Sequence, residues 1–259
     1  MKITILGNGK MANMLVQKLL PKSVNIEMWG RDLEKVKSVF GKFKIQITED
    51  IETAGLESDL IIIAVADSAI AEVAEKLGSR SCLVIHTSGA TPLDVLYKFE
   101  NSGVWWPPAS VQMIADEISE YAACVEASST ENNEKIISFS NMVGIYHILK
   151  CNSHKRLQMH TAAVFANNFT TYIMLRLREY CEAHQIPIDI YKPMLKQAMG
   201  TFFENNPNNL TGPASRGDKL TIKKHLEILQ PETEMKNIYE FLTESILTYK
   251  NFDFKIKDL

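Results

Sequence analysis

The sequence lacks the cysteine patterns that mark secreted scaffolds. Its four cysteines, Cys82, Cys124, Cys151 and Cys181, include no C-x-x-C pair and no framework spacing. The absence of such a pattern is typical of reduced thiols in a cytoplasmic protein. We therefore predict a cytoplasmic location, and we predict no metal site.

Long apolar runs and long runs of one charge are also missing. The longest apolar segment, LIIIAVA at 60–66, is far shorter than the roughly 20 residues that span a bilayer. The apolar part of the N-terminal MKITILGNG is too short for a signal peptide. The net charge is only −3. We therefore expect neither a membrane nor a nucleic acid as a partner.

The first half of the chain alternates short apolar runs with helical patterns, which predicts an α/β fold. We expect strands at 2–7, 24–29, 43–48, 59–66 and 82–87, with weaker signals at 103–106 and 122–127, and helices at 10–20, 32–40, 68–77 and 92–99. Several strands are apolar throughout, which indicates helices on both faces of the sheet. This alternation favours a Rossmann-type, doubly wound and mostly parallel sheet.

The second half shows only helical patterns. An apolar residue or threonine recurs every four positions along a long predicted helix at 154–184, and further helices are expected at 188–204, 219–230 and 233–250. We predict a dinucleotide-binding domain at 1–150 and a helical substrate and dimerisation domain at 151–259, with the boundary near 128–152.

A glycine loop directly follows the first strand and opens the first helix. ILGNGKMA matches G-x-G-x-x-A, with Gly7 for the tight turn, Gly9 for close approach of a pyrophosphate, and Ala12 for helix–strand packing. The helix N-terminus offers free N–H groups to phosphates. We predict a dinucleotide site here, which also includes Asn8, Lys10 and Met11. A glycine turn that binds nothing is the alternative.

The end of the second strand indicates which dinucleotide binds. NAD sites usually carry an acidic residue there, whereas this chain has Gly30 followed by Arg31. An arginine fork suits a 2′-phosphate, so we predict NADP rather than NAD. Glu27 lies inside the strand and is not expected to reach the ribose, and Asp32 is expected to cap the next helix. Arg31 could instead be an ordinary solvated side chain.

Two later strand ends complete the predicted cleft, because ligands bind at the carboxyl ends of parallel strands. In AVADS (64–68), Val65 and Ala66 leave room for the nicotinamide half. In HTSGA (86–90), Thr87 and Ser88 can donate hydrogen bonds to nicotinamide or substrate. Ser88 is equally suited to capping the segment that follows.

Five segments, ILGNGKMA, IIIAVADSAIAEVA, VIHTSGATPLDVL, HTAAVFANNF and LTGPASRGDKLTIKKHL, occur in this order. Together they resemble a family of NADP oxidoreductases with a Rossmann-like N-terminus and a helical C-terminal domain of unassigned function. That family is similar to pyrroline-5-carboxylate reductase, deazaflavin-dependent NADP reductases and 6-phosphogluconate dehydrogenase. The resemblance implies a dinucleotide site between the domains and a homodimer formed through the helical domains. Where many members carry His-Pro, this chain has Trp106-Pro107.

The helical half offers two candidate side chains, His160 and Asn168, on one face of the predicted long helix. They are eight residues apart, which is about 12 Å along the helix at a rise of ~1.5 Å per residue. The apolar surroundings predict that this face is buried. His160 is then either a proton donor to the substrate, with Asn168 positioning it, or a hydrogen-bonded core residue. His86 is a second candidate acid.

The stretch LTGPASRGDKL predicts a sharp turn into a helix capped by Asp218. It holds Arg216 at that turn, close in sequence to Thr211. We consider both as substrate-binding residues, Arg216 for an anionic group; the alternative is that Arg216 only shapes a helix corner.

These observations predict an NADP-dependent oxidoreductase that transfers hydride to or from a small C=N or C=O substrate. The candidate catalytic residues are His160, Asn168 and Ser88. The competing interpretation is a dinucleotide-binding sensor without turnover, because no Lys–Asn pair at helical i,i+4 spacing appears on the long helix.

Overall fold

A computed structural model describes residues 1–109, 120–203 and 210–258. The chain divides into two compact units, Met1–Phe169 and Thr170–Leu259. The first unit therefore extends past residue 150 into the helical half of the sequence. The boundary of an independently folding domain at 150 stays a prediction. None of the described helices is both long and apolar enough to cross a bilayer.

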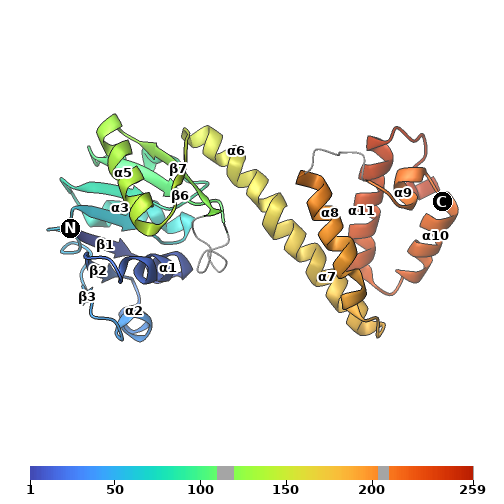
Figure 1. The fold of residues 1–259 in the computed structure, drawn as a ribbon, viewed down its shortest axis with the longest axis horizontal. Coiled ribbons are helices and arrows are strands. Elements are labelled where there is room, and N and C mark those ends of the chain that lie inside the picture. Colours follow the sequence, from blue (N-terminus) through green and yellow to red (C-terminus); the bar gives the residue numbers. More distant parts are fainter. Residues whose placement is uncertain (110–119, 204–209, 259) are drawn as a thin grey trace. The chain divides into compact units, whose positions relative to one another are not determined.

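The described part of the first unit forms one eight-stranded sheet in the order β3-β2-β1-β4-β5-β6-β7-β8 (Figure 1). The strands are β1 (Lys2–Leu6), β2 (Asn25–Trp29), β3 (Gln46–Ile47), β4 (Leu60–Ile63), β5 (Leu83–His86), β6 (Ser102–Trp106), β7 (Ala122–Ala127) and β8 (His147–Lys150). All neighbours pair in parallel except β6 and β7, which are antiparallel. The predicted Rossmann-type, mostly parallel sheet is confirmed.

Two apolar layers cover the sheet, as the uninterrupted apolar strands predict. One layer contains buried residues of α1 (Lys10–Leu19), α2 (Leu33–Phe40) and α5 (Thr130–Val143). The other contains buried residues of α3 (Ile70–Leu77) and the turn before β6. Strands β1 and β4 lie between these layers with every apolar side chain withdrawn from water.

The sequence prediction missed α5 and β8, which fill the region taken as the domain boundary. The start and stop signals of α5 are present: Ser129 accepts a hydrogen bond from Asn132 N, and Gly144 ends the helix at φ 102°. Its many Ser and Asn residues hide the apolar period. Strand β8 has only four residues and is half-exposed, so its pattern is weak.

Two further elements are shorter in the structure than the sequence predicts. The helix predicted at 92–99 is a short 3₁₀ helix, Leu93–Leu96, which starts after Pro92. The strand predicted at 43–48 contains only Gln46–Ile47, because this edge strand pairs with β2 at just two positions.

The helix predicted at 154–184 contains a π-helical segment. It comprises α6 (Ser153–Ala163), the π segment Val164–Phe169 and α7 (Thr170–Ala183). The second unit adds a 3₁₀ turn (Ile188–Tyr191), α8 (Lys192–Phe203), α9 (Pro213–Arg216), α10 (Lys219–Ile228), α11 (Thr233–Tyr249) and a last turn, Ile256–Asp258. Residue 204 of the predicted 188–204 helix lies outside the described residues.

The turn between α9 and α10 has the predicted chemistry. Gly212 precedes Pro213 at the start of α9, and Gly217 ends it in the left-handed region at φ 66°. Asp218 then caps α10 by accepting a hydrogen bond from Thr221 N at 3.1 Å. A side chain at 217 would also meet the ring of Phe252 at 2.5 Å.

We predict that Gly217→Ala lowers the free energy of unfolding by roughly 1–3 kcal/mol, because a left-handed residue gains a Cβ against Phe252. Gly200→Ala is the control: residue 200 is helical, and a Cβ there meets no atom of the described part of the chain within 4 Å. It should stabilise the protein by about 0.5–1 kcal/mol. Urea unfolding curves measure both changes, and equal effects in the two variants would contradict the assignment.

Candidate functional site

The first turn of α1 is built to receive an anion. Gly7 has φ 136°, and a Cβ there would lie 2.3 Å from the carbonyl oxygen of Ala64, so only glycine lets β1 end this close to β4. Gly9 precedes α1 without a side-chain cap, and a Cβ there meets no atom of the described residues within 4 Å. The first N–H groups of α1 therefore open onto free space, and Ala12 is buried beneath them.

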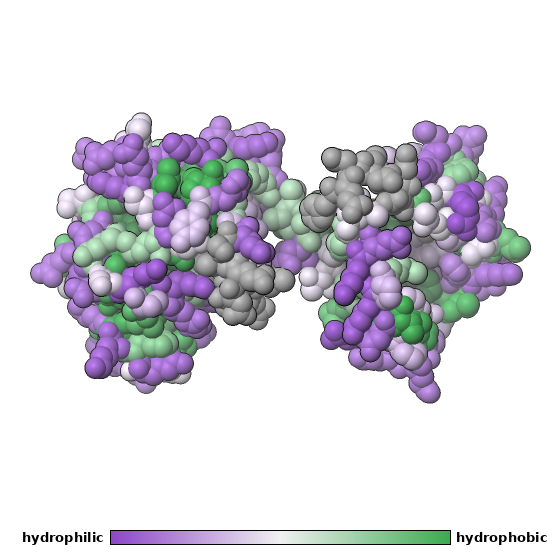
Figure 2. All heavy atoms as spheres, viewed as in Figure 1, coloured by the Kyte–Doolittle hydropathy of each residue, from purple (hydrophilic) through white to green (hydrophobic). Residues whose placement is uncertain are grey.

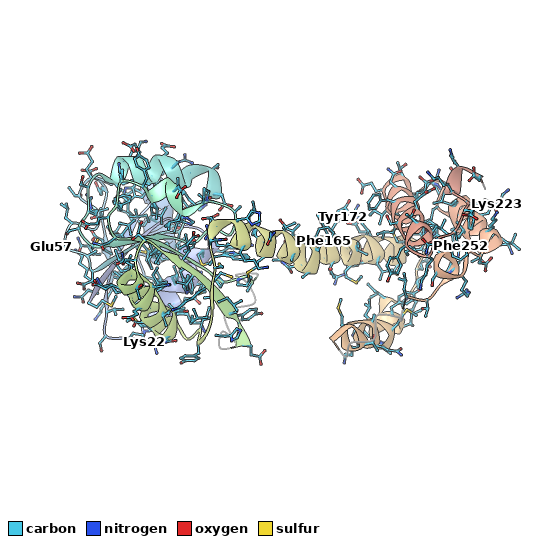
Figure 3. All side chains as sticks on the ribbon, turned by 90° about the horizontal axis from the view of Figure 1, so that it is seen from above. Lys22, Glu57, Phe165, Tyr172, Lys223 and Phe252 are labelled. Carbon is cyan, nitrogen blue, oxygen red and sulfur yellow. The ribbon has the colours of Figure 1, made fainter. Side chains whose placement is uncertain are left out.

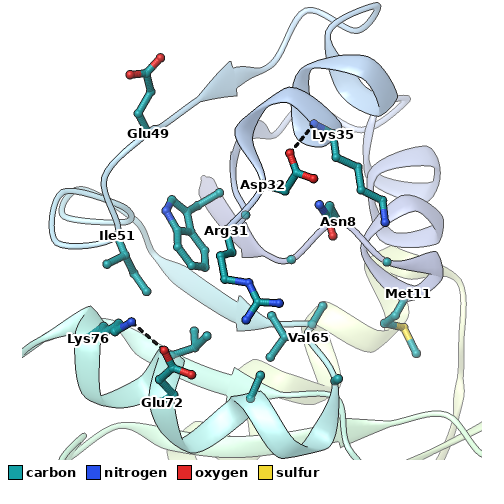
Figure 4. A pocket seen from close by; sticks show the side chains of 18 of the residues that line it. Asn8, Met11, Arg31, Asp32, Lys35, Glu49, Ile51, Val65, Glu72 and Lys76 are labelled. Carbon is teal, nitrogen blue, oxygen red and sulfur yellow. Dashed lines mark hydrogen bonds and ion pairs between the residues drawn. The ribbon is translucent and has the colours of Figure 1, made fainter.

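This helix terminus opens into a cavity of about 670 Å³ at the carboxyl ends of β1, β2 and β4. Eight of the predicted cofactor residues line it: Gly7, Asn8, Gly9, Lys10, Met11, Arg31, Val65 and Ala66. Figure 4 shows the Arg31 guanidinium projecting into the cavity, with Glu72 and Lys76 of α3 across from it. Of the other predicted residues, Ala12, Thr87 and Ser88 do not line it.

The acidic side chains of the cavity are already engaged. Asp32 caps α2 by accepting a hydrogen bond from Lys35 N at 3.0 Å, as predicted. Glu72 pairs with Lys76 at 2.6 Å and Glu49 with Lys37 at 3.4 Å.

Three cations of the cavity lack such partners. In the described parts of the chain, the charged groups of Lys10, Arg31 and Lys35 have no hydrogen-bond or ion-pair partner. The pKa of Glu72 is lowered mainly by its hydrogen bond to Lys76 and by the charge of Lys76. The positive charge of Arg31 adds a smaller, longer-range lowering of the same pKa. These three cations are therefore free to bind an anionic ligand, in a lining whose four cations are matched in number by the acids Asp32, Glu49, Asp50 and Glu72.

An acidic ribose ligand is absent at the end of β2 for a steric reason. A Cβ at Gly30 would lie 2.7 Å from a methyl of Val36, so no longer side chain fits there without repacking α2. Glu27 is buried and accepts hydrogen bonds from Thr4 and Thr48 at 2.9 and 2.8 Å. Burial raises its pKa, but these hydrogen bonds and Lys2 outweigh it and lower the pKa overall. Glu27 therefore belongs to the sheet and not to the cavity.

Sequence reasoning missed several cavity residues, of which Lys35 is the most informative. It lies three residues after the Asp32 cap, in the first turn of α2, and Figure 4 labels it beside Asn8. A cation three residues after a helix cap points back toward the preceding strand end, which is a usable signal. The others come from the end of β2, from loops and turns, and from α3: Trp29, Gly30, Asp32, Glu49, Asp50, Ile51, Ala64, Ala69, Glu72, Val73 and Lys76.

The loop after β5 is held by its own polar groups. Ser88 N donates to His86 Nδ1 at 3.2 Å, so the ring proton lies on Nε2, which faces Pro92 O at 3.4 Å. Burial, followed by the charge of Arg156, lowers the pKa of His86 to about 4. His86 is therefore fully buried with both ring nitrogens engaged inside the protein, which disfavours its role as a candidate acid. The Ser88 hydroxyl accepts from Ala90 N and Thr91 N, as a turn cap does.

A buried ion pair ties this loop to the start of α6. Arg156 is fully buried, pairs with Glu126 of β7, and donates to Thr91 O at 2.6 Å. Glu126 also accepts from the N–H and hydroxyl of Ser153 at 3.0 and 2.8 Å. The hydroxyl of Ser153 in turn accepts from Leu93 N. Three chain segments are thus locked together by charge-assisted bonds that are costly to leave half-made.

One turn further along α6, His160 lies against the same loop. A Cβ at Gly89 would lie 2.6 Å from both the His160 and Trp106 rings, and those rings meet edge to face at 5.4 Å. His160 is only partly buried, and its ring nitrogens have no hydrogen-bond partner in the described parts of the chain. The described residues thus supply none of the hydrogen bonds that a core histidine would have. The residue that replaces the family's histidine, Trp106, contacts it directly.

The remaining predicted site residues are placed as follows. Asn168 lies in the π segment and is exposed, as are Phe165 and Phe169, so the prediction that this face is buried is wrong for the single chain. A π-helical turn contains about one residue more than an α-helical turn. Asn168, eight residues after His160, therefore takes the direction that the seventh residue would have in an α-helix. Seven α-helical residues make nearly two full turns, so Asn168 shifts toward the face of His160. In the second unit Arg216 and Thr211 are exposed, so the Arg216 side chain is not buried at the helix corner.

Two family descriptions match parts of the sequence. Residues 2–88 match "NADP oxidoreductase coenzyme F420-dependent", and residues 121–246 match a domain of unknown function, DUF2520. An NADP oxidoreductase domain followed by a DUF2520 domain is consistent with a two-domain, Rossmann-like protein. This agrees with the resemblance drawn from its motifs, and its cofactor is NADP.

Solved structures agree over nearly the whole length. A putative NADP oxidoreductase from Bacteroides fragilis is 28% identical with a TM-score of 0.83, covering 95% of this chain and 98% of that one. An imine reductase from Myxococcus stipitatus in complex with NADP+ is 16% identical (TM-score 0.70, 97% and 93% covered). A reductive aminase from Aspergillus terreus in complex with NADPH and ethyl levulinate is 11% identical (TM-score 0.74, 96% and 94%). The last two show the fold alone. No curated protein matches the sequence.

The buried, neutral His86 predicts an acid-sensitive fold. The unfolded chain takes up this proton near pH 6.5 but the folded chain only near pH 4. The free energy of unfolding should therefore fall by roughly 3 kcal/mol as the pH drops through this window, at about 1.4 kcal/mol per pKa unit. His86→Asn, which keeps an acceptor for Ser88 N, should flatten that part of the curve.

Denaturant unfolding between pH 4 and 7 measures this difference between the parent and His86→Asn. The exposed His154 provides the control, because His154→Gln should leave the pH dependence as it is in the parent. Parallel curves for parent and His86→Asn would show that His86 is not the group responsible.

Proposed function

We propose that this protein transfers hydride between NADP and a small substrate that contains a C=N or C=O bond. The observation that carries the proposal is the cavity at the open N-terminus of α1, with three cations that have no partner in the described residues. When bound, NADPH supplies the hydride. The imine reductase and reductive aminase folds support a C=N substrate as the first class to test.

The residues around the cavity fit the cofactor as two anion sites. The free N–H groups after Gly9 and the cation of Lys10 suit a pyrophosphate. Arg31 and Lys35 suit a 2′-phosphate, because a guanidinium fork and an ammonium group can share its oxygens. Gly30, which has no room for a carboxylate, removes the usual preference for a free ribose hydroxyl.

For the substrate, we propose His160 as the proton donor to the nitrogen or oxygen of the reduced bond. The support is its partly exposed ring with unpartnered nitrogens, next to the loop that carries Ser88. The Ser88 hydroxyl accepts two backbone N–H groups and keeps its own proton to donate. Asn168, Arg216 and Thr211 remain proposals for orienting the substrate, Arg216 for an anionic group.

Turnover can be tested directly by following NADPH absorbance in the presence of cyclic imines, small ketones, and ketones mixed with amines. Oxidation of NADPH by one class and not the others identifies the reaction. His160→Gln should abolish most of the rate while leaving NADPH affinity unchanged. Tight NADPH binding with no oxidation by any class would favour the sensor without turnover.

Selectivity for NADPH should depend on Arg31. Arg31→Ala should weaken NADPH binding by about 1.5–3 kcal/mol, the value of charge-assisted hydrogen bonds, and leave NADH binding nearly unchanged. Lys22→Ala is the matched control, since Lys22 is an exposed lysine of the same unit that does not line the cavity.

Fluorescence titration of both cofactors measures this effect, with Lys35→Ala as a second variant expected to weaken NADPH by a smaller amount. Equal affinities of the parent for NADPH and NADH would contradict the assignment of Arg31.

We further propose a cytoplasmic homodimer formed through the helical half. The second unit exposes large apolar side chains on α7 and α11, among them Tyr172, Leu175 and Leu242 at 40–45% and Phe241 at 72%. Apolar patches are visible on its surface in Figure 2, and Figure 3 labels Tyr172 and the exposed Phe165. Clustered apolar exposure of this kind marks an association surface. A reducing compartment suits the four free cysteines.

Phe241→Glu should convert the dimer to a monomer at micromolar concentration, because a charge in an apolar interface loses its hydration. Tyr97→Glu is the control, since Tyr97 is 81% exposed in the first unit. Sedimentation velocity of the parent and both variants decides between the states. A monomeric parent would end the proposal.

A further inference from the structure

Three sulfur atoms converge where the last strands of the sheet meet α6. Cys124 of β7 is fully buried, and its Sγ lies 3.8 Å from Sδ of Met159 on α6. Cys151, directly after β8, packs in the same cluster, and its N–H donates to Val125 O at 3.1 Å. The fold thus gathers two thiols and one thioether from three elements.

We propose that Cys124, Cys151 and Met159 form a binding site for Cu(I). Soft thiolate and thioether ligands select this ion among the metals available to proteins. Structural zinc needs four ligands, usually cysteine and histidine. Within the described residues no group of three or more His, Cys, Asp or Glu could hold a metal, so zinc lacks a complete ligand set here.

The spacing of the Cys124 and Met159 sulfur atoms suits a shared ion. Three sulfurs around one ion at a metal–sulfur length of about 2.3 Å lie about 4.0 Å from one another. The 3.8 Å between Cys124 and Met159 already meets this within a few tenths of an ångström.

Binding requires that both thiols lose their protons, so two protons are released for each ion bound. Burial, followed by the neighbouring Cys151, raises the pKa of Cys124 to about 12. Burial also raises the pKa of Cys151. Arg156 lowers the pKa of both thiols, whereas Glu126 raises that of Cys151. Apparent affinity should therefore increase steeply with pH.

The other two cysteines provide internal controls. Cys82, at the amino end of β5, is partly exposed like Cys151, and it lines a separate hollow with Ser81 and Lys135. Cys181 is buried on α7 of the second unit. A site made by the cluster should leave both untouched, whereas unspecific reaction with thiols should include the accessible Cys82.

The first experiment uses the intact, reduced protein without substitutions. It is titrated anaerobically with Cu(I) against a chromophoric Cu(I) chelator, and parallel samples are alkylated with N-ethylmaleimide and mapped by mass spectrometry. We expect one ion per chain, protection of Cys151 from alkylation, and unchanged alkylation of Cys82. Binding should become at least tenfold tighter for each pH unit between 6 and 8.

The second experiment uses variants. Cys151→Ser should abolish binding, Met159→Leu should weaken it at least tenfold, and Cys82→Ser and Cys181→Ser should bind as the parent does. Circular dichroism checks the folding of each variant. Equal protection of Cys82 and Cys151, undiminished binding by Cys151→Ser, or loss of both cluster thiols as a disulfide without retained copper would each overturn the proposal.

Discussion

The approach of Gly7 to the end of β4 is the constraint on which the cavity depends. A single Cβ at residue 7 would overlap the carbonyl of Ala64, so the tight turn between β1 and α1 exists only with glycine there. The turn is closed by the N–H of Gly7, which donates to Trp29 O at 2.7 Å. That bond brings the ends of β1, β2 and β4 to one edge, where α1 presents its unpaired N–H groups.

Charge gives this edge its selectivity. Asp32, Glu49 and Glu72 of the cavity wall are each held by a cap or by a lysine, whereas Arg31 and Lys35 keep their charges for a ligand. The crowding of Gly30 by Val36 works in the same direction, because it denies the strand end a carboxylate. In the function that we propose, preference for a phosphorylated ribose follows from which cations remain unpaired and not from their number.

The Arg156–Glu126 pair organises the other part of the site. A buried ion pair adds little net stability, but breaking one partner is costly, so it favours a single arrangement of its segments. Here those segments carry Ser88, His160 and the neutral His86. Sequence alone could not pair residues thirty positions apart. Nothing in the spacing of Glu126 and Arg156 distinguishes them from surface charges.

The sequence by itself determined the sheet, the glycine loop, the Asp32 and Asp218 caps and the role of Arg31 as a candidate. Each follows from local rules: strand period, turn conformation and helix capping act within a few residues. Polar α5 and half-exposed β8 escaped because their apolar pattern is weak, and the π segment escaped because it depends on side-chain packing. Only the tertiary structure decided that Glu126 forms an ion pair with Arg156 and that the rings of His160 and Trp106 pack against Gly89. It also decided that Cys124, Cys151 and Met159 lie in one cluster. These contacts join residues distant in the chain, and only the packed core brings such residues within bonding distance.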